Sequence, residues 1–276
     1  MKSEELMKEI QQGLLIWYDF KPHCKVLYLG EGNEACADLL KKPTELSAAS
    51  SEQASGSQIC PQSFPDQLVF ACPKQTASLE WQQAYAGNFD YIIAIEILEK
   101  QDTPKEYLRC WRSLLKPDGT LILGMNNRLG LRYFCGDRDP YTERNFDGIE
   151  GYRQVYSKKE DKFRGHCYNR TELEAMLSDS GFVCPRFYSV LPDLRNPSLL
   201  YAEDYLPKED LPGRLFPIYN YPETVFLEEE SIYIDLIRSG MFHEMANAYL
   251  IECPLRGNTN DVIHVANSMG RGPKHA

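Results

Sequence analysis

The chain has 276 residues, of which 43% are hydrophobic and 25% are charged, as in an ordinary globular protein. Its formal net charge of −10 disfavours general nucleic-acid binding, because an acidic surface repels phosphate backbones. No apolar stretch approaches the roughly 20 residues that span a bilayer, and the first residues lack a cleavage-site pattern, so we expect neither a membrane span nor a signal peptide.

Strands and helices are predicted to alternate from residue 26 to about residue 125. The apolar run that begins at Val26 leads into two glycines, and QLVFA at 67–71 follows as the next clear strand. The pattern then predicts a helix over 76–87, a buried strand over 89–98, a helix over 103–119 capped by Thr103, and a buried strand over 120–125. Such alternation favours a parallel sheet with helices on both faces.

The second half of the chain has a different pattern. A capped helix is predicted over 169–182, and strands are predicted over 184–193 and 244–253. The segment 194–230 is rich in Pro, Tyr and acidic residues and lacks a clear periodicity, which is typical of a functional insertion or cover. We therefore predict a core of residues 1–193 and 240–253 that includes a lid at 126–168, a cover insertion at 194–239, and a loose tail or linker at 254–276.

The nine cysteines are scattered singly along the chain, without a CxxC pair. This spacing offers no zinc-ligand pattern, so we predict no metal site. Unpaired cysteines in an odd number are typical of a reducing compartment, and we predict a cytoplasmic protein.

The loop Gly30-Glu31-Gly32-Asn33-Glu34-Ala35 fits the dinucleotide-binding pattern G-x-G-x-x-A. A diphosphate needs backbone N–H groups without nearby anions, and Glu31 and Glu34 stand in the loop itself. S-adenosylmethionine carries a sulfonium and an ammonium group and no phosphate, so carboxylates near the loop favour this ligand. Glu96 adds an acid at the same predicted sheet edge, where ligands of open α/β sheets bind. A plain strand–helix turn without a ligand is the alternative.

Four stretches, VLYLGEGNE, ELS at 45–47, FDYIIAIEILEK and LLKPDGTLILGMNNRLGL, together resemble a class I S-adenosylmethionine-dependent methyltransferase. The resemblance implies an α/β fold, a doubly wound, mostly parallel seven-stranded Rossmann-like sheet with insertions. It implies S-adenosylmethionine as the cofactor, with an acid at the end of the second strand holding the ribose. The implied cofactor-binding residues are Leu29, Gly30, Glu31, Gly32, Glu45, Ala94, Ile95 and Glu96.

The stretch 126–152 is similar to a bacterial methyltransferase group associated with the glycosyltransferases of surface polysaccharide assembly. This similarity implies O-methylation of a glycan or glycan precursor, with a glycosyltransferase as a partner. No Asn-Pro-Pro-Tyr follows the strand at 89–98, which argues against amide or adenine N-methylation. The candidate general bases are His166 and Asp147, and the candidate acceptor-binding residues are Asn127, Arg128, Arg132, Asp139 and Tyr152.

Two departures from the family pattern leave other functions open. Tyr28 stands where the family has an acid before the glycine loop, and Glu34 replaces a small residue. These changes favour a non-catalytic, methyltransferase-like module that scaffolds a glycosyltransferase. An NAD-dependent oxidoreductase is a third hypothesis, which the G-x-G-x-x-A pattern favours and Glu31 disfavours.

Overall fold

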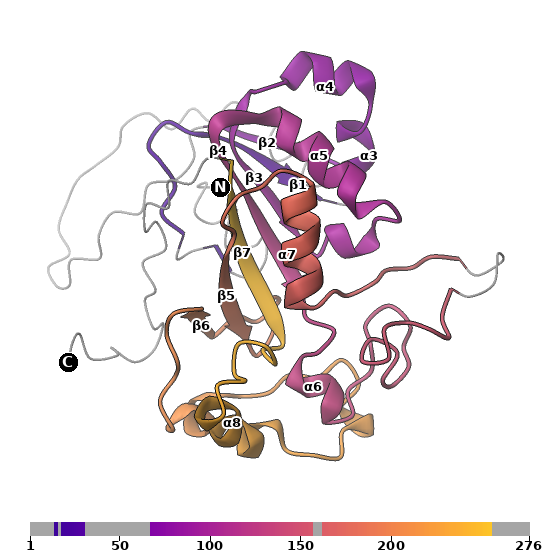
Figure 1. Ribbon diagram of the computed structural model, residues 1–276, viewed down its shortest axis with the longest axis vertical. Helices are drawn as coiled ribbons and strands as arrows, with labels where there is room; N and C mark the ends of the chain where they lie inside the picture. The colour runs from indigo at the N-terminus through magenta and orange to yellow at the C-terminus, as the bar shows by residue number, and fades with distance from the viewer. Residues whose placement is uncertain (1–13, 16–17, 31–66, 157–161, 256–276) are drawn as a thin grey trace, which may run out of the picture.

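The structure, a computed structural model, describes residues 14–15, 18–30, 67–156 and 162–255. Its centre is one seven-stranded sheet (Figure 1). In spatial order the strands are β2 (Gln67–Ala71), β1 (Lys25–Leu29), β3 (Phe89–Ile95), β4 (Leu115–Asn126), β7 (Ala248–Pro254), β5 (Arg186–Leu191) and β6 (Leu199–Ala202). The four strands from β2 to β4 are parallel, and the pairings of β7 with β4 and β5, and of β5 with β6, are antiparallel. The predicted α/β class with seven strands is confirmed, and its parallel character holds for the first half of the sheet.

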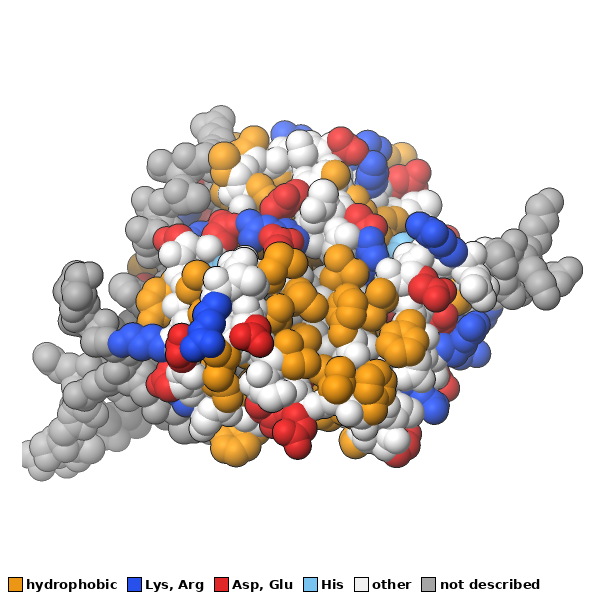
Figure 2. Space-filling model, turned by 60° about the horizontal axis from the view of Figure 1, so that its bottom comes forward, with side chains coloured by type: hydrophobic (Ala, Val, Ile, Leu, Met, Phe, Trp, Pro, Cys, Tyr) orange, Lys and Arg blue, Asp and Glu red, His pale blue; other side chains and the backbone are white. Residues whose placement is uncertain are grey.

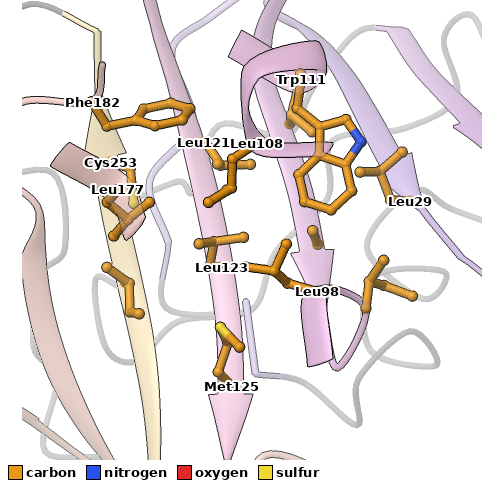
Figure 3. Packing of buried hydrophobic residues seen from close by; sticks show 14 of the residues in the cluster. Leu29, Leu98, Leu108, Trp111, Leu121, Leu123, Met125, Leu177, Phe182 and Cys253 are labelled. Carbon is orange, nitrogen blue, oxygen red and sulfur yellow. The ribbon is translucent and has the colours of Figure 1, made fainter. Parts of the chain in front are cut away.

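One face of the sheet packs against helices. These helices are α3 (Pro73–Thr76), α4 (Leu79–Tyr85), α5 (Pro104–Leu114) and α7 (Arg170–Asp179). In α5 the buried residues Leu108, Trp111 and Leu114 recur at helical spacing and belong to one core cluster with Leu121 and Leu123 of β4, and Figure 3 shows Leu108 beside Leu121. Burying an aliphatic or aromatic side chain of this kind contributes about 1.5–3 kcal/mol, so this layer carries much of the stability.

The other face of the sheet is covered, in the described part of the chain, by the segment before β1. Leu14, Leu15, Tyr18 and Phe20 are buried there and pack over residues such as Tyr91. The hydroxyl of Tyr18 donates a 2.7 Å hydrogen bond to Glu252 of β7. Of the described helices, α3, α4, α5 and α7 line the first face, and the expectation of helices on both faces stays a prediction for residues outside the described ranges.

A third apolar cluster lies at the end of the molecule where α6 (Leu131–Phe134) and α8 (Glu229–Arg238) are found (Figure 1). It joins Leu131 and Cys135 to Tyr233 and Phe242. The 194–230 segment, whose sequence shows no clear periodicity, contains β6, two 3₁₀ turns, Leu211–Arg214 and Pro222–Thr224, and the start of α8. Its apolar residues therefore form a core of their own with the region that follows β4.

Most element predictions are confirmed, with shifted ends. The strand at 67–71 is β2, and the helix predicted over 76–87 is the shorter α4. The helix predicted over 103–119 ends at Leu114, because Leu115 already pairs with Phe89 in the sheet. The strand predicted over 89–98 ends at Ile95, and a 3₁₀ turn covers Leu98–Lys100. Among the described residues, no helix is both long and apolar enough to cross a membrane.

Candidate functional site

The carboxyl ends of three parallel strands meet at one edge of the sheet. Leu29 at the end of β1 pairs with Ala94 of β3, and Ile95 pairs with Gly124 of β4. The chain leaves β1 toward β2 on one side and returns to β3 on the other, so this edge is a topological switch point. The edge is where an open α/β sheet binds its ligand.

Five of the predicted cofactor-binding residues come together at this edge: Leu29, Gly30, Ala94, Ile95 and Glu96. Leu29, Ala94 and Ile95 are buried in the sheet. The backbone N–H of Gly30 continues the pairing with β2 by donating to the carbonyl of Ala71 at 3.1 Å. The other three predicted residues, Glu31, Gly32 and Glu45, lie outside the described residues.

The acid that the resemblance implies at the end of the second strand, Glu45, lies outside the described residues. β2, the strand that pairs with the outer side of β1, ends at Ala71 and is followed by Cys72 and Pro73. The N–H of Cys72 donates to the side chain of Gln75 at 2.9 Å, which closes the first turn of α3. Among the described residues that directly follow β2, none carries a carboxylate.

Glu96 turns the chain at the end of β3. Its φ is +53°, a conformation that few residues other than glycine adopt. Its carboxylate accepts hydrogen bonds from the side-chain amide of Asn126 at 3.2 Å and from Arg195 Nε at 3.3 Å. The arginine is therefore engaged with Glu96, which places a paired carboxylate at the switch edge.

Glu99 is a second carboxyl group at the same edge, and it is not among the site residues predicted from the sequence. The residue is fully buried, and its Oε1 atom accepts hydrogen bonds from Asn126, from the backbone N–H at 2.8 Å and from the side chain at 3.4 Å. Burial first, and then the charge of Glu96, raise the pKa of Glu99 to about 8. The sequence does indicate a second acid at this edge, because Glu99 follows Glu96 by three residues and lies in the 3₁₀ turn after the strand.

The lid region contains a buried cluster around Tyr152. The Tyr152 hydroxyl donates to Asp139 at 2.5 Å and accepts from the N–H of Cys167 at 2.9 Å. The ring of His166 packs edge-on against the ring of Tyr152, with 4.2 Å between the ring centroids. It stacks on the ring of Tyr168, with a centroid distance of 4.6 Å. Burial lowers the pKa of His166, so the ring is neutral at pH 7 and can accept a proton.

His166 is also tied to the switch edge. Its backbone N–H donates to the carbonyl of Glu99 at 2.8 Å. The structure therefore brings the predicted base His166 and the predicted acceptor-binding residues Asp139 and Tyr152 beside the end of β3. Asp147 belongs to the same loop: its carbonyl accepts from the N–H of Tyr152 at 2.8 Å, and its buried carboxylate lies 3.6 Å from Arg144.

The remaining predicted acceptor-binding residues make internal contacts. Arg128 forms a bidentate salt bridge with Glu172, in which its Nε and Nη2 atoms donate to the two carboxylate oxygens at 2.8 and 2.9 Å. The amide of Asn127 donates to the carbonyls of Glu244 and Ala246, both at 2.8 Å.

Arg132 is also internal. It is almost completely buried, and its Nε donates to Asp137 at 2.7 Å. Contact of Asn127, Arg128 and Arg132 with an acceptor stays a prediction, and their described bonds are those of residues that hold the lid in place.

The residues at the switch edge suit a ligand that carries positive charge. Two carboxyl groups lie there, and the arginine beside them is already paired with one. The Glu96 carboxylate would repel a diphosphate and attract a sulfonium. Glu99 lies buried behind it and shares the amide of Asn126 with it.

Comparisons with known proteins agree with this geometry. A family model described as a methyltransferase domain matches residues 15–184, more than half of the chain. Fumosorinone synthetase from Cordyceps fumosorosea is 28% identical in a 175-residue alignment that covers 58% of this chain. The chain spans about 4% of the length of that curated relative.

Solved structures of methyltransferases are among the chains to which this protein is similar, at low identity. An S-adenosylmethionine-dependent methyltransferase from Thermotoga maritima is 14% identical, with a TM-score of 0.41 over 92% of this chain and 98% of that one. One from Archaeoglobus fulgidus is 15% identical, with a TM-score of 0.40 over 91% of this chain and 94% of that one. On the strength of the family match, the chain belongs to the methyltransferase domain family, enzymes whose methyl donor is S-adenosylmethionine.

Proposed function

We propose that the protein transfers a methyl group from S-adenosylmethionine to a hydroxyl oxygen of a glycan or glycan precursor. The observation that carries this proposal is the pair of carboxyl groups, Glu96 and Glu99, at the switch edge of the sheet. They favour a cation-bearing donor over a dinucleotide. The glycan class and a glycosyltransferase partner come from the sequence resemblance, and the proposed cytoplasmic location comes from the unpaired cysteines.

His166 is the base that we propose for the acceptor hydroxyl. The donor supplies an electrophilic methyl group, and the protein has to align the acceptor and remove its proton. The His166 ring is half-buried, and burial lowers its pKa, so the unprotonated form is present at neutral pH. Asp147 and Asp139 would hold the loop around this ring through their bonds to Tyr152.

An acceptor with a long apolar part is a second candidate, and a surface feature favours it. Apolar side chains gather on the end of the molecule where α6 and α8 lie (Figure 2). Phe226 packs on Gly136 so closely that a Cβ there would lie 2.5 Å from the ring. Large exposed apolar residues of the lid and the cover are Phe134, Phe146, Phe216, Ile218, Phe226 and Leu227.

Calorimetric titration of the whole chain with S-adenosylmethionine, S-adenosylhomocysteine and NAD tests the donor. We expect micromolar binding of the first two and no binding of NAD. No response to any of the three would support the scaffold hypothesis, and a response to NAD alone would support the oxidoreductase.

Turnover with sugar and long-chain acceptors, followed by mass spectrometry of the methylated product, then tests the acceptor. The variant His166→Asn should lower turnover at least tenfold without weakening donor binding. Unchanged turnover would exclude His166 as the base, and methylation of long-chain acceptors alone would favour the second candidate.

A further inference from the structure

Glu96 and Glu99 share a single hydrogen-bonding partner. The side-chain amide of Asn126 donates to Glu96 at 3.2 Å and to Glu99 at 3.4 Å, so the two carboxyl groups are held on the same amide. Glu99 uses only its Oε1 atom in these bonds. Its Oε2 atom is buried and receives no hydrogen bond from any described residue. A buried carboxyl oxygen without a partner is costly, which points to a ligand or a proton at this atom.

The titratable groups that face Glu99 are one carboxyl group and several uncharged hydroxyl and thiol groups. Glu96 faces it from the end of β3, Tyr141 from the lid, and Cys167 and Tyr168 from the segment before α7. Lys100 of the same turn is the one cation among the neighbours that act on Glu99, and its effect is smaller than those of burial, of Glu96 and of the bonds from Asn126. Arg195, which lies nearby, is paired with Glu96. Without a ligand, Glu99 therefore keeps its proton at neutral pH, in line with its pKa of about 8.

We propose that Glu99 distinguishes the charged methyl donor from its neutral product by losing a proton when the donor binds and regaining one when the methyl group has left. The inference rests on the proposed function, because it requires the donor to bind at this edge. On donor binding the O–H bond of the Glu99 carboxyl breaks, and the proton goes to solvent. Transfer of the methyl group converts the sulfonium into an uncharged thioether, and Glu99 then takes up a proton from solvent.

The affinity for the donor should therefore depend on pH in a way that the affinity for the product does not. Below about pH 8 the carboxyl has to ionise before it attracts the sulfonium, so donor affinity rises with pH by up to about tenfold per unit. Above that range the carboxylate is already present, and the dependence disappears. S-adenosylmethionine and S-adenosylhomocysteine carry the same amino and carboxyl groups, so the difference between them isolates the sulfonium.

The test is calorimetric titration of the whole chain with both compounds at pH 6.5 and pH 9, in two buffers of different ionisation enthalpy and in the presence of EDTA. We expect S-adenosylmethionine to release close to one proton more than S-adenosylhomocysteine at pH 6.5 and none at pH 9. The variant Glu99→Gln keeps the shape of the side chain and should abolish this difference. The variant Glu106→Gln, at an exposed position of α5, should preserve it.

Equal proton release for the two compounds in the wild-type chain would overturn the inference and leave donor binding intact. Failure of both compounds to bind would overturn the proposed function as well. Titration with Mg²⁺ alone, without EDTA, provides a third outcome. If Mg²⁺ releases the proton and EDTA abolishes the difference, the carboxyl pair binds a metal ion and the sulfonium assignment is wrong.

Discussion

At the scale of single residues, the site depends on how burial changes ordinary side chains. Glu96 was predictable, because an acid directly after a buried β-branched strand has to emerge at the edge of a parallel sheet. Glu99 was not, because its burial depends on Asn126 and on the lid, which are distant in sequence. The internal bonds of Asn127 and Arg132 were hidden for the same reason.

The stability of the fold should depend on the ionisation of Glu99. Its pKa rises from an ordinary value of 4.5 to about 8 on folding, so the folded state binds the proton more tightly. The resulting stabilisation is complete below pH 4.5 and is lost as pH rises toward 8. Between these values we expect the wild-type free energy of unfolding to fall, relative to Glu99→Gln, by at most about 1.4 kcal/mol per pH unit.

Urea unfolding of both proteins at pH 5, 6.5 and 8 measures this difference. The gap between their free energies of unfolding should change steadily over the series. Parallel behaviour of the two proteins at all three pH values would show that Glu99 is not protonated in the folded state.

At the scale of elements, the sequence predicts a helix start well where a side chain accepts hydrogen bonds from the free backbone N–H groups of the first turn. The helix predicted over 169–182 is present as α7, and it begins with a capping box in which Asn169 and Glu172 bond each other's backbone at 2.9 and 2.8 Å. Helix ends set by tertiary pairing were less predictable. α5 ends at Leu114 because Leu115 pairs with Phe89 in the sheet, and the residues around Leu114 do not indicate this pairing.

Removing the cap of α7 should destabilise the protein measurably. Asn169→Ala deletes the side chain that accepts from the N–H of Glu172 and should lower the free energy of unfolding by about 1 kcal/mol. Ser78→Ala, at the exposed cap of α4, is the matched control, and its longer 3.3 Å bond should give a smaller loss. Thermal unfolding compares the two variants, and an equal or larger loss for Ser78→Ala would contradict the assignment.

At the scale of the whole molecule, the seven-stranded sheet followed from the resemblance, but the place of the cover did not. The cover lacks a regular apolar period because its buried residues pack on α6 and on the ends of β5 and β6 instead of on one helix face. Asp137 holds the two parts together. It pairs with Arg132 and accepts the N–H groups of Asn220 and Tyr221 at 3.0 and 2.8 Å.

Loss of the Arg132 side chain should disrupt this junction. Arg132→Ala leaves Asp137 as a buried, uncompensated charge, which typically costs about 3–5 kcal/mol. Arg238→Ala breaks the exposed pair with Glu209, which solvent screens, and should destabilise the protein far less than Arg132→Ala. Chemical denaturation of the two variants checks this contrast, and similar losses would mean that Asp137 is adequately satisfied by the backbone alone.

The bonds from Asn220 and Tyr221 to Asp137 also bear on how the protein is made. During synthesis, residues 132 and 137 leave the ribosome more than eighty positions before these partners do. Until then the Asp137 carboxylate lacks two of its hydrogen-bond donors, so solvation by water stabilises it more than burial in the protein interior does. The nascent chain therefore has to complete the lid late, after β1, β3 and β4 have been synthesised.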